Sequence, residues 1–368
     1  MIIREMRLAG FRNYAQAAFA PASGITVLHG ENAQGKTNLI EAIYLCCVGR
    51  SGRTARDQEL VRWGDRFAQV AITAERLDGV HDVTVRIIPQ DKRKKVIKIN
   101  GSPAARLGEL MGHVNAVLFS PEDLRLVKEG PEGRRRFLDM AISQLSPGYF
   151  YALQRYIRAL NQRNGLLKSL MANPSGSLSS TLDEWDALLA EAGGEVITRR
   201  ARHVKTLKEA ARETHAMLSG GREILTLAYE SGAENAEELL HMLRAARKED
   251  VRRGTTSHGP HRDDLRMTLC GHDTRAFASQ GQQRTAALSL KLAELDVMRE
   301  VIGESPVLLL DDVMSELDVN RRKMLLRRMR DVQTLITCTH MSDLGGAVYE
   351  AAYRVKEGTI SSEEAFHL

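Results

Sequence analysis

The chain has no run of about 18 apolar residues, so the sequence predicts no membrane-spanning helix. Its four cysteines show no C-x-x-C spacing, which disfavours both a zinc site and a disulfide framework. The first residues also lack the pattern of a secretory signal. We therefore expect a cytoplasmic protein with no membrane partner, whose cysteines fill the core.

Neither sign of charge dominates the composition. The 368 residues include 52 Lys and Arg against 47 Asp and Glu, which gives a net charge of +5. That balance permits binding to DNA without identifying it. With 43% hydrophobic residues the chain can bury a sizeable core, and its length favours about two or three domains.

The strongest motif is a phosphate-binding loop near the start of the chain. Its pattern, G-x-x-x-x-G-K-[ST], is filled by Gly30, Glu31, Asn32, Ala33, Gln34, Gly35, Lys36 and Thr37. The apolar run 25–28 predicts a strand before the loop, and 38–45 predicts a helix after it, as the motif requires. Backbone N–H groups and the helix N-terminus favour phosphate there. Lys36 would reach the β- and γ-phosphates and the Thr37 hydroxyl would bind Mg²⁺, so we expect ATP and Mg²⁺ as cofactors.

A second nucleotide motif lies far along the chain. The apolar run 307–310 predicts a buried strand that ends in Asp311 and Asp312, the Walker B pattern. Asp311 would hold Mg²⁺, and Asp312 would orient or deprotonate the attacking water. Because the two motifs stand near opposite ends of the sequence, a long insertion must leave the nucleotide domain and return.

Three weaker elements surround the acid pair. Ser279 and Gly281 precede the amphipathic run 286–301, so Ser279 is expected at a helix N-terminus suited to a phosphate. Taken alone, such a serine is usually only an N-cap. Residues 315–318 follow the acids, and His340 ends the next predicted strand. In this order the elements resemble the signature, D-loop and switch histidine of an ATP-binding-cassette ATPase.

The chain also shows signs of an inserted helical part. Short β-like runs dominate its beginning, whereas apolar residues recur at helical spacing from Pro121 onward. We predict an ATPase head built from 1–120 and 254–368, and a helical second lobe from 121–253. Within that lobe a short antiparallel helical hairpin is interrupted at 173–177.

Several stretches of the sequence resemble the RecF family. They follow one another in the family's order: 8–14, 30–37, 120–124, 133–139, 259–264, 279–284 and 309–318. The cassette-type head of that family is similar to those of SMC and Rad50 proteins. The resemblance therefore implies an α/β fold with an ABC-ATPase (SMC/Rad50-like) P-loop head and an inserted, mainly helical second lobe.

The same resemblance implies a function. It is that of an ATP-dependent, DNA-binding recombination mediator that dimerises on DNA and helps load RecA at gaps during DNA repair, replication restart and SOS induction. The resemblance implies RecO and RecR as partners. It also implies a cytoplasmic protein associated with the nucleoid. Its weak, DNA-stimulated ATPase activity would act as a switch. The implied site residues are Asp312 and His340 for catalysis, Thr37 and Asp311 for the metal, and Arg12, Asn13, Ser279 and Gly281 beside the P-loop for the nucleotide.

Some positions depart from the family's pattern. Gln280 stands where the signature usually has glycine. Asp312 stands where the second acid is usually Glu, and its side chain is one methylene shorter. The shorter side chain puts its reach to the attacking water in question, and slow hydrolysis would suit a switch. Ser120 is the candidate for the position of the Q-loop glutamine.

Basic residues cluster in three places. Asp91–Lys95 joins the predicted strands 83–88 and 96–99, Arg199–Arg212 forms a stripe at helical spacing, and Arg134–Arg136 is contiguous. Each cluster is either a contact for DNA phosphates or an ordinary solvated turn, exposed face or packing element. No aromatic residue interleaves with them, so contacts with the DNA backbone are favoured over base stacking.

The run His258–Asp264 is dense in polar groups. It contains His258, His261, Arg262, Asp263 and Asp264. Because these residues have no established ligand spacing, a turn is favoured over a metal site. The pattern gives no role for them beyond that.

Two other functions share the P-loop. A small-molecule kinase would have no use for Ser279 or for residues 315–318. The long insertion and the weak signature argue against a transporter ATPase subunit. ATP turnover stimulated by duplex DNA would distinguish the DNA switch from a kinase, and co-purification with a membrane partner would favour a transporter.

Overall fold

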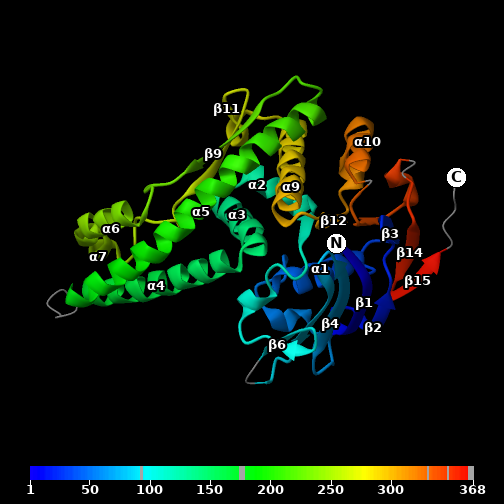
Figure 1. Ribbon diagram of the computed structural model, residues 1–368, viewed down its shortest axis with the longest axis horizontal. Helices are drawn as coiled ribbons and strands as arrows, with labels where there is room; N and C mark the ends of the chain where they lie inside the picture. The colour runs from blue at the N-terminus through cyan, green and yellow to red at the C-terminus, as the bar shows by residue number, and fades with distance from the viewer. Residues whose placement is uncertain (92–93, 174–178, 330, 346–347, 364–368) are drawn as a thin grey trace. The chain divides into compact units, whose positions relative to one another are not determined.

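The chain folds into two compact units. The computed structural model describes residues 1–91, 94–173, 179–329, 331–345 and 348–363. Contacts group Met1–Asp123 with Lys291–Leu368 in the first unit, and Leu124–Leu290 form the second (Figure 1). The chain thus leaves the first unit and returns to it, as the distant motifs require.

The return falls later in the chain than the sequence suggested. The sequence pattern set the boundaries at 120/121 and 253/254, whereas the observed units divide at 123/124 and 290/291. The second difference has a simple cause. Strand β10 (Asp264–Leu269) pairs antiparallel with β9 (Leu225–Glu230) over its whole length, which keeps the residues that follow residue 254 in the second unit.

One sheet of the first unit is antiparallel. Its six strands follow the order β2-β1-β4-β5-β6-β7. They are β1 Ile2–Phe11, β2 Tyr14–Phe19, β4 Ala68–Arg76, β5 Gly79–Ile87, β6 Lys95–Ile99 and β7 Ser102–Pro103. Burial in β4 alternates residue by residue, as expected for a strand with one face on the core. Pairing of β5 with β6 confirms the predicted hairpin, although Lys92 and Arg93 at its tip lie outside the described residues.

The other sheet of the first unit is mostly parallel. Its order is β15-β14-β3-β13-β12-β8, with only β15 antiparallel to its neighbour. The strands are β3 Ile25–His29, β8 Ala116–Phe119, β12 Val307–Asp311, β13 Thr334–Cys338, β14 Ala351–Lys356 and β15 Thr359–Glu363. All residues of β12 and β13 are buried, which is typical of parallel strands covered on both faces.

Helix α1 (Lys36–Val48) lies between the two sheets. It contacts β4 and β5 of the first sheet and β8, β12 and β13 of the second. Apolar residues surround it on all sides, the pattern of a core helix. Buried Gln333 links the sheets, because its amide exchanges hydrogen bonds of 2.6 and 2.9 Å with the backbone of Ile3 and donates to Ala22 O at 2.8 Å.

Shorter elements complete the first unit. They are helix α10 (Val319–Arg328) and the 3-10 turns η1 Asp57–Leu60, η2 Leu107–Leu110, η3 Pro121–Leu124, η4 Met314–Glu316 and η5 Met341–Leu344. Turn η3 ends one residue beyond the boundary between the units.

Two expectations from composition can be compared with the fold. Cys46, Cys47 and Cys338 are buried core residues, as predicted, but the prediction was wrong for Cys270, which is exposed. Cys270 follows the last residue of β10 and has a φ of 50°, so it belongs to a tight turn and not to the core. In the described part of the chain, no helix combines the length and the apolar character needed to cross a membrane.

The second unit is mainly helical. Its helices are α2 Arg125–Lys128, α3 Pro131–Leu145, α4 Pro147–Ala172, α5 Ser179–Ser219, α6 Ala236–Ala245, α7 Arg247–Arg253 and α8 Thr274–Phe277, and α9 Gln280–Ile302 continues into the first unit. Ion pairs of Arg155 with Glu195 and of Arg163 with Asp186 join α4 and α5 as an antiparallel hairpin, as predicted. Of the predicted interruption at 173–177, residues 174–177 lie outside the described residues. A small sheet, β11-β10-β9, with β11 at His272–Asp273, completes the unit.

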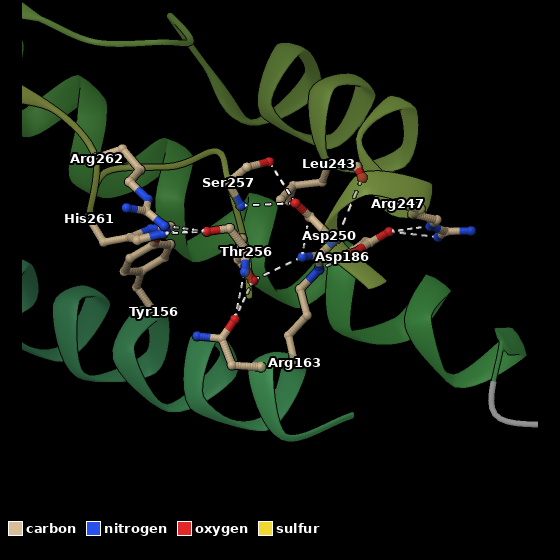
Figure 2. Close-up of polar contacts among 11 residues, drawn as sticks. Tyr156, Arg163, Asp186, Leu243, Arg247, Asp250, Thr256, Ser257, His261 and Arg262 are labelled. Carbon is tan, nitrogen blue, oxygen red and sulfur yellow. Dashed lines mark hydrogen bonds and ion pairs between the residues drawn. The ribbon is translucent and has the colours of Figure 1, made fainter. Parts of the chain in front are cut away.

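A fully buried arginine organises the helices near the far end of this hairpin. Figure 2 shows Arg163 of α4 between Asp186 of α5 and Asp250 of α7. Its Nε donates to Asp186 Oδ1 at 2.6 Å, and its Nη1 donates to Asp250 Oδ2 at 2.7 Å and to Thr256 Oγ1 at 2.9 Å. Arg247 donates to the second oxygen of Asp186 at 2.7 Å. Two carboxylates and two guanidinium groups are therefore paired in this cluster, and Arg163 at its centre has no contact with solvent.

The polar run His258–Asp264 continues this network. Tyr156 and His261 Nδ1 are 2.5 Å apart, and His261 Nε2 lies 3.1 Å from Thr256 O (Figure 2). Buried Arg200 donates to Pro260 O at 2.8 Å. The run is a polar clasp between the helices and β10, which gives a structural role to residues that the sequence left without one. No group of three or more possible His, Cys, Asp or Glu ligands occurs among the described residues.

Arg163→Ala tests whether this cluster holds the second unit together. Loss of the guanidinium leaves two buried carboxylates without their main partner, which should destabilise the unit by about 3–5 kcal/mol. Urea unfolding followed by circular dichroism gives the measurement. The matched control is Arg155→Ala on the same helix, whose exposed pairs with Glu191 and Glu195 contribute at most about 1 kcal/mol. Equal losses in the two variants would contradict a special role for Arg163.

Candidate nucleotide site

Residues 30–35 join β3 to α1 and form the loop that the sequence predicts. The loop curls because Gly30, Ala33 and Gly35 have φ values of 146°, 65° and 116°. Asn38 N and Leu39 N donate to Gly35 O at 3.0 and 3.2 Å, so the first turn of α1 starts directly at the end of the loop. Successive free N–H groups ahead of a helix form a concavity that suits an anion. The predicted order of strand, loop and helix is confirmed.

Backbone from both ends of the chain supports this loop closely. A Cβ atom added at Gly30 would lie 2.4 Å from Val355 O in β14, and one added at Gly358 would lie 2.4 Å from Asn13 O. Glycine at these two positions is therefore a steric requirement. The support arises because β14 pairs parallel with β3 and brings the β14–β15 turn beside the loop.

Asn13 lies behind the loop. Its Nδ2 donates to Gln34 O at 2.8 Å, and its Oδ1 accepts from Asn38 Nδ2 at 2.8 Å. Tyr14, the next residue, donates its hydroxyl to Gly35 O at 3.0 Å. The turn between β1 and β2 thus fixes the conformation of the P-loop. A direct contact of Asn13 with nucleotide stays a prediction.

Lys36 folds back over the loop that precedes it. Its Nζ donates to Gly30 O at 2.5 Å and to Glu31 O at 2.8 Å. Burial lowers the pKa of Lys36, whereas the nearby Asp312 raises it. A cation that is partly desolvated gains more from an incoming anion than one in water, so the residue suits a phosphate ligand.

Asp311 connects the P-loop helix to the central strands. Its Oδ1 accepts from Thr37 Oγ1 at 2.9 Å and from Thr337 Oγ1 at 2.8 Å. Burial raises the pKa of Asp311, and a nearby cation would offset that penalty. Hydroxyl and carboxylate oxygens are ligands that Mg²⁺ accepts together with phosphate. The residues present therefore fit Mg²⁺.

Asp312 adopts a less common backbone conformation. Its φ is 55°, in the left-handed region, and its N–H donates to Thr337 Oγ1 at 2.9 Å. The two consecutive carboxylates thus have different surroundings, one held by two threonines and one facing a cavity. This cavity has a volume of about 270 Å³, and its lining residues are Asn32, Ala33, Gly35, Lys36, Thr37, Asn38, Arg53, Asp312 and Thr337.

Arg53 is a cavity residue that sequence reasoning missed. Its Nη1 donates to Asn38 Oδ1 at 2.9 Å and lies 3.5 Å from Glu41 Oε2. Arg12 binds the same carboxylate more closely, with Nε and Nη2 at 2.8 and 2.7 Å from the two Glu41 oxygens. Ser51 also donates to Glu41. The sequence offered only several arginines after a helix as a signal, and such a run is common on surfaces.

Ser279 begins helix α9 in the second unit. Its Oγ accepts from Gln282 N at 3.3 Å, while Gln282 Oε1 accepts from Ser279 N at 2.8 Å, which is a capping box. The predicted position at a helix N-terminus is confirmed. Ser279 is exposed and Gly281 half-buried. Whether either residue contacts a nucleotide stays a prediction.

The remaining predicted site residues lie at ends of the central strands. His340 is exposed two residues after β13, and its N–H donates to Asp343 Oδ2 at 3.0 Å. Ser120 directly follows β8, the strand beside β12, so it occupies the strand end next to the acid pair. In the run 315–318, Asp318 caps α10 by accepting from Arg321 N at 3.0 Å, and the side chain of Glu316 lies outside the description.

The three basic clusters have different surroundings. Arg134 is buried and forms two hydrogen bonds of 2.7 Å with Asp264, so it serves packing within the second unit. Lys95 binds Asp57 at 2.7 Å. On α5, Arg202, Lys205 and Lys208 are exposed. The α5 stripe therefore offers several cations to solvent, whereas two cations of the hairpin cluster, Lys92 and Arg93, lie outside the described residues.

Comparison with known proteins gives one consistent result. The family model of the RecF/RecN/SMC N-terminal domain matches residues 2–360. The DNA replication and repair protein RecF of Acetivibrio thermocellus is 43% identical over 348 residues, covering 92% of this chain and 93% of that protein. RecF of Clostridium novyi is 39% identical over 369 residues, covering 98% and 100%.

Solved structures agree with the sequence comparison. A structure described as the recombination mediator protein RecF-ATP in the RecFOR pathway has a TM-score of 0.91 and 35% identity, covering 98% of this chain and 97% of that chain. The Smc head domain of Pyrococcus furiosus has a TM-score of 0.57 at 18% identity and shares the fold alone. The predicted SMC-like ABC-ATPase head is confirmed.

Gly30→Ala tests the steric support of the loop. The added Cβ would collide with Val355 O, so the loop must shift and its binding of a fluorescent ATP analogue should weaken about tenfold or more. Gly101→Ala is the control, because Gly101 also has a positive φ, of 80°, but open space around it. Unchanged affinity in Gly30→Ala would show that the close approach to β14 does not shape the site.

Proposed function

Because this chain belongs to the RecF family, we propose that it is an ATP-dependent, DNA-binding recombination mediator of DNA repair and replication. Near full-length similarity to proteins named for DNA replication and repair supports this, as does similarity to a RecF described as a mediator of the RecFOR pathway. In this proposal the protein dimerises on DNA with ATP and helps load RecA at gaps. It acts with RecO and RecR in repair, replication restart and SOS induction, on the nucleoid in the cytoplasm.

The observation that carries the proposal is the pair of motifs that meet at one cavity. Lys36 and Thr37 come from one end of the sequence, and Asp311 and Asp312 from the other. This arrangement supports ATP binding and slow hydrolysis. Kinase and transporter functions receive no such support from the relatives.

In hydrolysis each residue of the site would have a separate role. Lys36 and the loop N–H groups bind the β- and γ-phosphates and offset their charge. Mg²⁺, held by Thr37 and Asp311, would stabilise the charge that develops on the phosphate oxygens. Asp312 orients a water molecule and accepts its proton as the new bond to the γ-phosphorus forms and the bond to ADP breaks. His340 would contact the γ-phosphate and sense its loss.

Dimerisation would complete each site. Ser279 is exposed at the start of α9, so its hydroxyl and the helix N-terminus are available to the nucleotide of a second protomer. ATP then acts as a ligand that binds the dimer better than the monomer and shifts the population toward it. Hydrolysis returns the monomer. A weak, DNA-stimulated ATPase of this kind is a switch and not a metabolic enzyme.

Contacts with DNA would be mainly electrostatic. The exposed cations Arg202, Lys205 and Lys208 of α5 suit phosphate contacts with little sequence preference. Affinity should then fall steeply as the salt concentration rises.

Asp312→Asn should separate ATP binding from hydrolysis. The amide keeps the size of the side chain but cannot accept the proton of the attacking water. Turnover should fall by about 10²–10⁴-fold, while binding of ATP persists and an ATP-bound dimer accumulates. Phosphate release and light scattering measure the two effects. Asp331→Asn, the same change at an exposed acid that does not line the cavity, should leave both unchanged. Wild-type turnover by Asp312→Asn would assign the role to another residue.

Ser279→Arg tests the composite site and with it the proposed switch. A bulky cation should block dimerisation with ATP and gapped DNA, as measured by light scattering, and abolish turnover, while the monomer still binds ATP. Ser279→Asn retains a good N-cap and should still dimerise, which separates blocking from loss of the cap.

A mixture with Lys36→Met sharpens this test. In that heterodimer one site has both the intact lysine and the intact serine, and the other has neither. Roughly half the activity per dimer should return if the sites act independently, as the linkage of ATP to dimerisation allows. No recovery in a demonstrated heterodimer would mean that Ser279 acts within its own protomer or that both sites must act together.

A further inference from the structure

A tryptophan of the first unit is almost fully exposed. Trp63 retains 96% of its accessible surface, although tryptophan is a residue that folded proteins usually bury well. It stands between η1 and β4, in a stretch that sequence reasoning did not single out. Exposed aromatic side chains with an apolar body often anchor a binding partner.

The backbone holds this tryptophan in a defined turn. Arg62 N donates to Gly10 O at 2.8 Å, and Asp65 N donates to Arg62 O at 3.0 Å. Gly64 supplies the φ of 86° in the third position of the turn, as a type II turn requires. The segment is also fastened before the turn, because Arg12 N donates to Leu60 O at 2.8 Å. The backbone hydrogen bonds of this turn therefore hold Trp63 at the surface.

Uncompensated positive charge accompanies the tryptophan. The side chains of Arg50, Arg56 and Arg66 are exposed and form no hydrogen bond or ion pair with any residue that the structure describes. Of the acids in the same stretch, Asp57 pairs with Lys95 at 2.7 Å and Asp65 lies 3.7 Å from Arg62, while Glu59 accepts a hydrogen bond of 2.6 Å from the neutral Thr54. The segment 50–66 therefore carries five arginines against three acids and exposes Trp63 within the same short stretch of sequence.

We propose that the segment 50–66 binds unpaired DNA, with Trp63 stacking on an exposed base and Arg50, Arg56 and Arg66 contacting phosphates. The proposal rests on the proposed DNA-binding function and adds to it a preference for single-stranded character. An aromatic ring provides a stacking face for any base, and arginines offset the charge of the backbone. Bases inside a continuous duplex have no free face, so the site distinguishes gapped from intact DNA. An apolar pocket of a protein partner would bury the indole ring but would provide no negative charge for the three arginines.

The same segment reaches the nucleotide cavity at its other end. Arg53 lines that cavity, ten residues before Trp63 in the sequence. The proposed base-binding residue Trp63 and the cavity residue Arg53 thus belong to the same short segment.

The test compares two circles of the same duplex, one covalently closed and one with a short single-stranded gap. The chain has two tryptophans, so Trp185→Phe leaves Trp63 as the only indole and makes its emission a direct report of stacking. Gapped DNA should quench that emission, and closed DNA should not. In the otherwise unchanged protein, Trp63→Ala should lower affinity for the gapped circle by about 5- to 150-fold and leave affinity for the closed circle unchanged.

Two variants serve as controls that do not depend on the change at position 185. Trp63→Phe keeps a stacking face and should retain most of the preference for gapped DNA. Leu77→Ala removes another apolar side chain of the same unit, 81% exposed, and should bind like the wild type.

Three outcomes overturn the inference. They are binding of gapped DNA without quenching, wild-type affinity in Trp63→Ala, and equal loss of affinity for both circles. Failure of the wild-type protein to bind either circle would overturn the proposed function itself.

Discussion

A single buried carboxylate joins the parts of the head that come from opposite ends of the sequence. Oδ1 of Asp311 accepts one hydrogen bond from Thr37 of α1 and another from Thr337 of β13. Burial raises the pKa of Asp311, and the hydrogen bonds from the two threonines lower it. The geometry of the cavity depends on this junction, because it joins α1 to β12, the strand that directly precedes Asp312.

Strand order explains why the motifs must be distant in the sequence. β3 lies between β13 and β14, so the P-loop that follows β3 has late strands on both sides. The turn after β14 then approaches the loop closely enough that only glycine fits at Gly30 and Gly358. In this topology the conformation of the P-loop after β3 depends on β13 and β14, which come from the end of the chain.

Sequence reasoning was most successful where local chemistry dictates structure. The loop from Gly30 to Thr37, the buried strand before Asp311 and the capping position of Ser279 follow from backbone conformation, hydrophobic pattern and helix termini. The return to the head at residue 291 was missed because it depends on pairing of β9 with β10, a long-range contact that no local pattern encodes.

Polar partners chosen by tertiary structure were also missed. The clasp at His258–Asp264, the ion pairs of Arg163 and the position of Arg53 each join segments far apart in the sequence. A buried arginine and an exposed one look alike in a sequence. Trp63 had no recognisable pattern for a similar reason, since its exposure follows from the turn that displays it.

Glu41 provides the physical link between the displayed turn and the cavity. This buried carboxylate receives Arg12 at 2.7 Å and Arg53 at 3.5 Å. Arg12 also donates to Glu59 O at 3.0 Å, so it links segment 50–66 to Glu41 of α1 a few residues before Trp63. Arg53 is held less closely and its side chain is 45% exposed. Arg53 also donates to Asn38 Oδ1 at 2.9 Å, and its side chain lines the nucleotide cavity. Segment 50–66, which we propose to bind unpaired DNA, therefore includes one side chain that also lines the nucleotide cavity.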